Sequence, residues 1–195
     1  LYLTGKADGV PAADLESLVR QWFVMSVLTG RYSGSPETRY DQDIRQIKSD
    51  GLPAQVKTVC GATLSDQYWD SLLPSQMNTS AARSPYWTCF QAAQAALGFN
   101  GFLSSKISCR DLIENRGDAH HIYPKNYMKT REYARSEYNQ IANLTLTQQE
   151  INIAIGDKAP SKYFSELVKQ CNGGEKTYGN ITSTPDLEQN LAEHA

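Results

Sequence analysis

The first hundred residues carry apolar side chains at the spacing of amphipathic helices. Residues 12–29 form one apolar stripe, which Gly30 would end. Further helices are predicted to begin at Ser35-Pro36 and Ser84-Pro85, because proline is well tolerated in the first turn of a helix. A short helix is predicted over residues 63–73, where Pro74 would end it. The large aromatic side chains of this helical scaffold are expected to form its core: Trp22, Phe23, Trp69, Trp87 and Phe90.

After residue 100 the pattern changes to short runs of alternating polarity. Residues 106–115 alternate weakly and are predicted to be extended. Residues 120–124 and the cleanly alternating residues 143–147 are expected to pair as a hairpin with a long connection. Thr147 followed by Glu150 is typical of a capping box, so a helix should run from about Gln148 to Ile155.

The predicted fold class is mainly α with a small β-hairpin. A last helix is expected from Pro160 to Cys171, and the residues from 177 onward are polar with little pattern. The expected organisation is one compact unit with a helical scaffold over 1–100, a mixed core over 101–175 and a polar tail over 176–195. A helix packed across the hairpin could bring Asn152, in its second turn, to His120, although 32 positions separate them.

Composition is that of an ordinary soluble globular protein. The 195 residues are 40% apolar and 21% charged, and no apolar run approaches the ~20 residues of a membrane span. The four cysteines are widely spaced and lack zinc-site spacing, so we expect reduced, mostly buried thiols and a cytoplasmic location. The first residues lack the order of a signal peptide. Because the chain begins at Leu1 rather than Met, we expect a fragment of a longer protein.

The net charge is only −2, so the distribution of charge along the chain is more informative than its sum. Residues 101–135 carry seven Lys and Arg against four Asp and Glu, whereas the segments before and after are acidic on balance. Such a bias is often an ordinary solvated surface. Here it surrounds His120 and His121, which are two of only three histidines in the chain.

Adjacent histidines have a chemical use in the hydrolysis of a phosphodiester. A neutral imidazole can deprotonate water near pH 7, and a divalent cation can offset charge on the phosphoryl oxygens and the leaving oxygen. Adjacent side chains on a strand point to opposite faces, so His120 and His121 are expected to have different roles. A histidine pair of this kind also occurs without function on surfaces and in cores, and spacing leaves that alternative open.

Three stretches, DAHHIYPKNY, NQIANLTLTQQEIN and IGDKAPSKYF, together resemble the signature of HNH nucleases, whose core is a ββα-metal fold. The match is similar above all to the C-terminal domain of GmrSD-like modification-dependent restriction endonucleases of phage defence, and it covers about residues 116–164. The earlier stretch GRYSGSPETRYDQDI also resembles the helical segment that precedes the nuclease core in that family. Residues 51–107 carry little of the resemblance.

The resemblance implies a role for each matching residue. His121 would be the general base that activates water, and His120 a metal ligand where many of these nucleases have Asp. Asn152 would be the second protein ligand, and Asn143 would tie the loop and orient the base. Asp118 would contact the metal through water or support His120.

The same resemblance implies Mg²⁺, Mn²⁺ or another divalent cation as cofactor, without structural zinc. DNA is the expected partner, with phosphate contacts from Lys125, Lys129, Arg131 and Arg135, which could equally be an ordinary solvated loop. An N-terminal domain outside this chain would sense modified DNA or bind nucleotide, and a homodimer is possible. The alternative function is a catalytically inactive DNA-binding or interaction module with the same fold. Nicking against double-strand cutting, and DNA against RNA, stay open.

Overall fold

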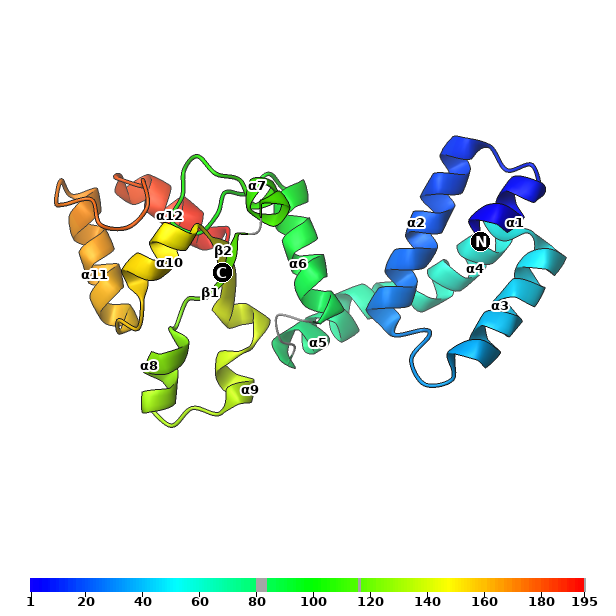
Figure 1. Cartoon of the computed structure of the whole chain (residues 1–195), viewed down its shortest axis with the longest axis horizontal. Coiled ribbons are helices and arrows are strands. Elements are labelled where there is room, and N and C mark those ends of the chain that lie inside the picture. Colours follow the sequence, from blue (N-terminus) through cyan, green and yellow to red (C-terminus); the bar gives the residue numbers. More distant parts are fainter. Residues whose placement is uncertain (80–83, 116, 195) are drawn as a thin grey trace. The chain divides into compact units, whose positions relative to one another are not determined.

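The chain folds into two compact units, Leu1–Pro74 and Ser75–Ala195, which are described separately here (Figure 1). A computed structural model describes residues 1–79, 84–115 and 117–194. It is mainly helical and has one two-stranded antiparallel sheet, so the predicted fold class is confirmed. The predicted boundary at residue 100 differs from the division after Pro74. Trp87, which the sequence pattern assigns to the scaffold, packs with Cys109 and Leu112 in the second unit.

The first unit is built from four α-helices and a π-helical turn. They are α1 (Tyr2–Ala7), α2 (Ala12–Thr29), α3 (Pro36–Asp50), α4 (Leu52–Thr63) and η1 (Tyr68–Leu72); α5 (Leu73–Thr79) spans the division between the units. Gly30 ends α2 in the left-handed conformation, as predicted. Pro53 and Pro74 lie near the starts of α4 and α5, where a missing N–H costs little. The sequence pattern misses α4 because it treats the proline as the end of a helix rather than as part of a helix start. The prediction that Pro74 ends a helix is wrong for the same reason.

The core of the first unit gathers on one face of α2. Leu15, Trp22 and Met25 are buried there against Ile47 and Val56. Phe23 follows Trp22 by one position, which turns its side chain about 100° around the helix, and it is 66% exposed. The predictions that Phe23 and Trp69 form core are therefore wrong, because both side chains are exposed.

The second unit places a short hairpin among helices (Figure 1). Its strands are β1 (Asp118–His121) and β2 (Leu144–Thr147), which pair antiparallel with His120 opposite Thr145. Before the hairpin lie α6 (Pro85–Ala96) and α7 (Cys109–Glu114); within the connection lie α8 (Lys125–Thr130), α9 (Arg135–Tyr138) and the 3₁₀ turn η2 (Ile141–Asn143); after it lie α10 (Gln149–Ile155), α11 (Pro160–Cys171) and α12 (Thr184–Ala192). The predicted hairpin and the two helices that follow it are confirmed, but the first strand lies earlier than the predicted residues 120–124, since residues 122–124 are outside it.

Two local predictions around the hairpin are wrong, and in both cases the hydrogen-bond partner of a hydroxyl group decides the local structure. Residues 106–115 are not extended, because Ser108 and Asp111 form a capping box that begins α7. Thr147 does not cap α10, because its hydroxyl donates to the carbonyl oxygen of Phe102 at 2.9 Å. The hydroxyl of Thr147 therefore serves the buried end of β2 and not the start of α10.

The C-terminal segment is part of the core rather than a polar tail. Tyr178, Ile181 and Leu187 are buried against α10 and α11. Gly179 passes so close to the chain that a Cβ there would lie 2.0 Å from the carbonyl oxygen of Leu103. Asn190 also accepts from the N–H of Leu103 at 2.8 Å. The segment therefore completes the interior of the second unit, and the predicted tail over 176–195 is wrong.

His194 is the last buried group of this segment. Its Nε2 lies 2.9 Å from the carbonyl oxygen of Asn100, and its Nδ1 lies 2.7 Å from the hydroxyl of Thr145. Because the carbonyl can only accept, Nε2 carries the proton and Nδ1 accepts from Thr145. Burial lowers the pKa of His194, which keeps the ring neutral, while the bond to Asn100 acts in the opposite direction.

The four cysteines are free thiols, as predicted. The expectation that most of them are buried is wrong, because only Cys109 is buried. Its burial raises the pKa of that thiol to about 11. Across residues 1–79, 84–115 and 117–194, no helix combines the length and the apolar character that crossing a bilayer requires.

We expect Leu187→Ala to lower the free energy of unfolding by about 2–5 kcal/mol, because it leaves a cavity in the core. The neighbouring Glu188 is exposed and offers a matched control. Glu188→Ala should change the free energy of unfolding by less than about 0.5 kcal/mol. Urea unfolding followed by circular dichroism measures both. Equal, small effects of the two substitutions would mean that the C-terminal segment does not pack on the core.

Candidate functional site

Strand β1 and helix α10 bring two of the predicted ligands together. The Nδ1 atom of His120 lies 2.6 Å from the Oδ1 atom of Asn152. His120 occupies the face of the hairpin that Thr145 and Thr147 share, and α10 contacts β1 directly. The sequence expectation that these two residues meet across 32 positions is confirmed.

Asp118 determines how the Asn152 amide is oriented. The Nδ2 atom of Asn152 donates to the Oδ2 atom of Asp118 at 3.1 Å. An ionised carboxylate only accepts hydrogen bonds, so this contact directs the amide oxygen of Asn152 towards His120. The Nδ1 atom of His120 must then carry the proton of that bond, and the lone pair is left on Nε2. Asp118 thus supports His120 through Asn152, since no direct bond joins the carboxylate and the ring.

The Nε2 atom of His120 is a buried acceptor that no described residue satisfies. The residue is only 3% exposed, and its ring stacks on Phe102 with 6.0 Å between centroids. Burial lowers the pKa of His120, and His121 adds to the lowering; the bond to Asn152 and the charge of Asp118 oppose it. The ring is therefore neutral, which is the state that a metal ligand requires.

This group of residues fits a divalent cation by its chemistry. In the described part of the chain, no three His, Cys, Asp or Glu side chains gather as a metal site. The present group instead combines an amide oxygen and a nearby carboxylate, which suit Mg²⁺ or Mn²⁺, with an imidazole nitrogen, which suits transition metals. In the observed arrangement the lone pair of His120 Nε2 points away from Asn152, so His120 and Asn152 could hold one ion together only if Nδ1 became the ligand atom.

His121 is placed apart from this group. Adjacent residues of a strand face opposite ways, and His121 is half-buried with its Nε2 atom 2.9 Å from the Oδ1 atom of Asn139. Its ring also meets Tyr138 edge-on, with 6.3 Å between centroids. If the amide oxygen of Asn139 accepts from Nε2–H, the Nδ1 atom of His121 is left free to take a proton.

Asn143 ties the long connection to the end of the hairpin. Its Oδ1 atom accepts from the N–H of Tyr123 at 2.7 Å, and its Nδ2 atom donates to the carbonyl oxygens of Tyr123 and Tyr138. Tyr138 directly precedes Asn139, so these bonds hold the partner of His121 in place. The geometry agrees with the loop-tying role that the resemblance implies for Asn143.

The four basic residues of the connection are exposed, and none makes an ion pair with a described residue. Lys125 and Lys129 lie on α8, Arg131 follows α8, and Arg135 begins α9. Arg131 lies over the ring of Tyr127 at 5.3 Å from the ring centroid, within the limit of about 6 Å for a cation–π contact. Their charges are therefore available to an external anion such as a phosphate.

Asn139 and His194 are the two polar residues of this region that the sequence pattern misses. Asn139 follows a basic segment and resembles any turn-forming asparagine, so no local signal marks it. His194 also contacts Phe102, in an edge-on arrangement with 5.7 Å between centroids. It supports the wall of the site rather than belonging to it.

Comparison with known proteins finds a distant relative. No family model matches the chain, and no solved structure matches it. A curated protein of Methanocaldococcus jannaschii, "Uncharacterized protein MJ0686", is 24% identical over 156 residues, covering 77% of this chain and 25% of the relative. The chain therefore spans about a quarter of the length of that relative.

We expect the ring of His121 to carry its proton on Nε2, because Asn139 accepts there. Nitrogen-15 NMR of the imidazole distinguishes the two tautomers, and Asn139→Ala should shift the population towards a mixture. Asn126→Ala is the matched control, since Asn126 belongs to the same connection but bonds Asp157. An unchanged tautomer in Asn139→Ala would show that Asn139 does not orient the ring.

Proposed function

We propose that the second unit is a metal-dependent HNH endonuclease that hydrolyses phosphodiester bonds in DNA. The observation that carries the proposal is the 2.6 Å contact between His120 on β1 and Asn152 on α10, next to His121. It occurs in the order strand, strand, helix that the HNH resemblance implies. The cut is a nick in one strand or, if two copies act together, a break in both.

Each residue has a stated task in this reaction. His121 takes a proton from the attacking water at Nδ1, and the contact with Asn139 keeps that atom available. His120 and Asn152 would hold the cation, and Asp118 orients Asn152. When bound, the cation supplies charge that stabilises the phosphoryl and leaving oxygens.

The connection between the strands would bind the DNA backbone. Lys125, Lys129, Arg131 and Arg135 are exposed and carry no base-reading arrangement, so their contacts are with phosphates. Asn143 fixes the connection to the hairpin and thereby relates these charges to His121.

The wider setting follows from the resemblance. The chain would be the nuclease portion of a phage-defence restriction protein, and a further domain would sense modified DNA or bind nucleotide. The free thiols support a cytoplasmic location.

A second candidate is a catalytically inactive DNA-binding or interaction module of the same fold. The observation that favours it is the burial of His120, whose Nδ1 is already bonded to Asn152. This candidate predicts DNA binding without strand scission at any metal concentration. Incubation with supercoiled plasmid over a series of metals separates inactive, nicking and cutting outcomes.

We expect His121→Ala to lower plasmid cleavage by about 10²–10⁴-fold, because the general base is lost. Added imidazole should restore part of the activity, and Asn126→Ala should cleave like the parent chain. The circular dichroism spectrum of His121→Ala should match that of the parent. If His121→Ala cleaves as well as the parent, His121 is not the base.

We expect EDTA to stop cleavage and Mg²⁺ or Mn²⁺ to restore it. Asp118→Ala should raise the metal concentration needed for half-maximal cleavage by about 10–100-fold, because Asn152 loses the group that orients it. Metal titration of the cleavage rate measures the shift, and Asp157→Ala outside the site is the control. Persistent cleavage in chelator would remove the metal from the mechanism.

A further inference from the structure

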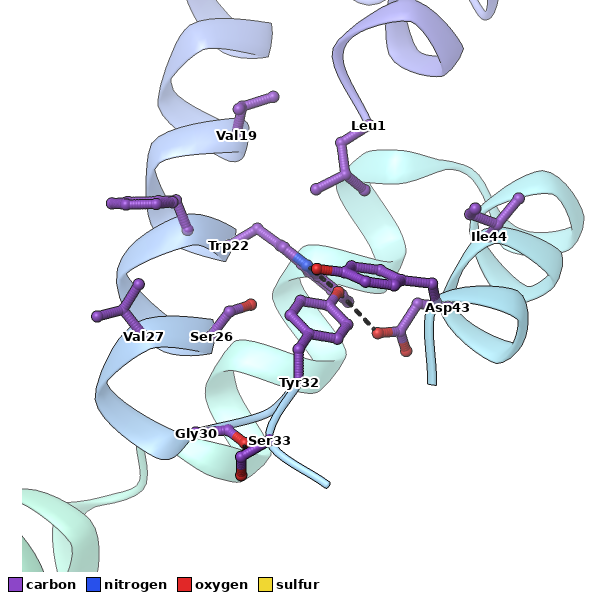
Figure 2. Close-up of a pocket in the computed structure, with 12 residues that line it drawn as sticks. Leu1, Val19, Trp22, Ser26, Val27, Gly30, Tyr32, Ser33, Asp43 and Ile44 are labelled. Atoms are coloured by element: carbon purple, nitrogen blue, oxygen red, sulfur yellow. Dashed lines mark hydrogen bonds between the residues drawn. The ribbon is translucent and has the colours of Figure 1, made fainter. Parts of the chain in front are cut away.

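The first unit contains a cavity that the proposed nuclease does not use. It has a volume of about 590 Å³ and lies between α2, the turn at Gly30 and α3. Figure 2 shows Val19, Ser26 and Val27 on the α2 side and Ile44 on the α3 side, with Tyr32 and Trp22 between them. A volume of this size is in the range of small-molecule sites, about 300–1,000 Å³.

The stretch GRYSGSPETRYDQDI supplies one side of the cavity. Tyr32, Tyr40 and Ile44 from this stretch line it, and the rings of Tyr32 and Tyr40 stack with 4.1 Å between centroids. Phe23 lines it from α2 and is largely exposed. The aromatic residue that fails to join the core thus has a place in the cavity wall.

The cavity wall offers no uncompensated charge. Asp43 is buried, and its carboxylate accepts from the guanidinium of Arg31 and from the hydroxyl of Tyr32 at 2.9 Å. The hydroxyl of Tyr32 in turn accepts from Nε1 of Trp22 at 2.8 Å, as the dashed lines of Figure 2 show. A charged ligand would find no free partner in this chain of bonds, so the wall favours a neutral one.

Ser26 supplies a hydrogen-bonding group that has no partner. The residue is only 8% exposed, it lines the cavity, and its Oγ atom bonds no described residue. Leaving a buried hydroxyl unpaired is unfavourable, whereas a ligand with one polar group could satisfy it. Aromatic walls and a single buried hydroxyl without a partner together define the ligand.

We propose that this cavity binds a neutral aromatic small molecule that carries one hydrogen-bonding group, which Ser26 meets. The proposal does not depend on the nuclease proposal, since the two sites belong to different compact units.

The test is a calorimetric titration of the whole chain with indole and three analogues. Indole should bind with a dissociation constant of about 1 mM or below, as expected for a ligand of this size. The analogue 1-methylindole, which lacks the N–H, should bind about fivefold more weakly. The anion indole-3-acetate and the cation tryptamine should each bind at least about fivefold more weakly than indole.

Two neighbouring valines of α2 provide the matched variants. Val27 is 42% exposed and Val24 is 43% exposed, but only Val27 lines the cavity. Val27→Trp should weaken indole binding at least about tenfold by filling the space, and Val24→Trp should leave it unchanged. Ser26→Ala should lower the affinity for indole to that for 1-methylindole and leave 1-methylindole binding as it is.

Several results would overturn the proposal. They are no heat of binding at about 10 mM indole, equal binding of the charged analogues, or equal effects of the two valine substitutions. Sedimentation gives a further check: if the chain is a dimer that Val27→Trp dissociates and Val24→Trp does not, a second copy fills the cavity and the ligand proposal fails.

Discussion

The polar site of the second unit depends on the amide of Asn152. An amide has a donor end and an acceptor end, so the carboxylate of Asp118 at one end determines what the other end presents to His120. Through this relay a half-buried carboxylate selects the tautomer of a buried ring. The relay exists only because α10 follows the hairpin immediately and lies against β1. One short helix thereby joins the hydrophobic core to the candidate chemistry.

The interior around the site contains two buried histidines, and burial favours the neutral form of both. His120 and His194 contact Phe102, and burial lowers the pKa of each. His194 satisfies both of its ring nitrogens, so its neutral form is fully paired. His120 satisfies only one, and this difference between similar environments identifies His120 as the residue that needs an additional partner. The C-terminal segment matters to this comparison because it supplies His194, the histidine whose two ring nitrogens are both hydrogen-bonded.

The sequence pattern predicts the meeting of His120 and Asn152, because hairpin and helix are adjacent in the chain and leave few ways to pack. It fails where local capping signals are overlooked and where a partner comes from a distant segment. Ser108 with Asp111 and Ser183 with Asp186 are capping signals of the same kind as Thr147 with Glu150. The first two begin helices, whereas the hydroxyl of Thr147 is drawn to Phe102, 45 positions away. Local spacing cannot predict that Thr147 bonds a distant carbonyl instead of capping the helix. It also cannot predict that His121 bonds Asn139.

The unpartnered nitrogen of His120 also limits how a cation could be held there. If Nδ1 became the ligand atom, its proton would move to Nε2, where no described residue accepts it. If Nε2 became the ligand atom, the ring would have to reach the cation while Asn152 keeps Nδ1. The first arrangement leaves a buried N–H unpaired, at a cost of about 1–3 kcal/mol, and the second leaves Asn152 unable to bind the same cation. Protein donors alone therefore make a weak site, and phosphate oxygens from a bound backbone would be needed to complete it. In the proposed nuclease, cation binding would then be linked to substrate binding, and a buried group of residues could serve an exposed, basic connection.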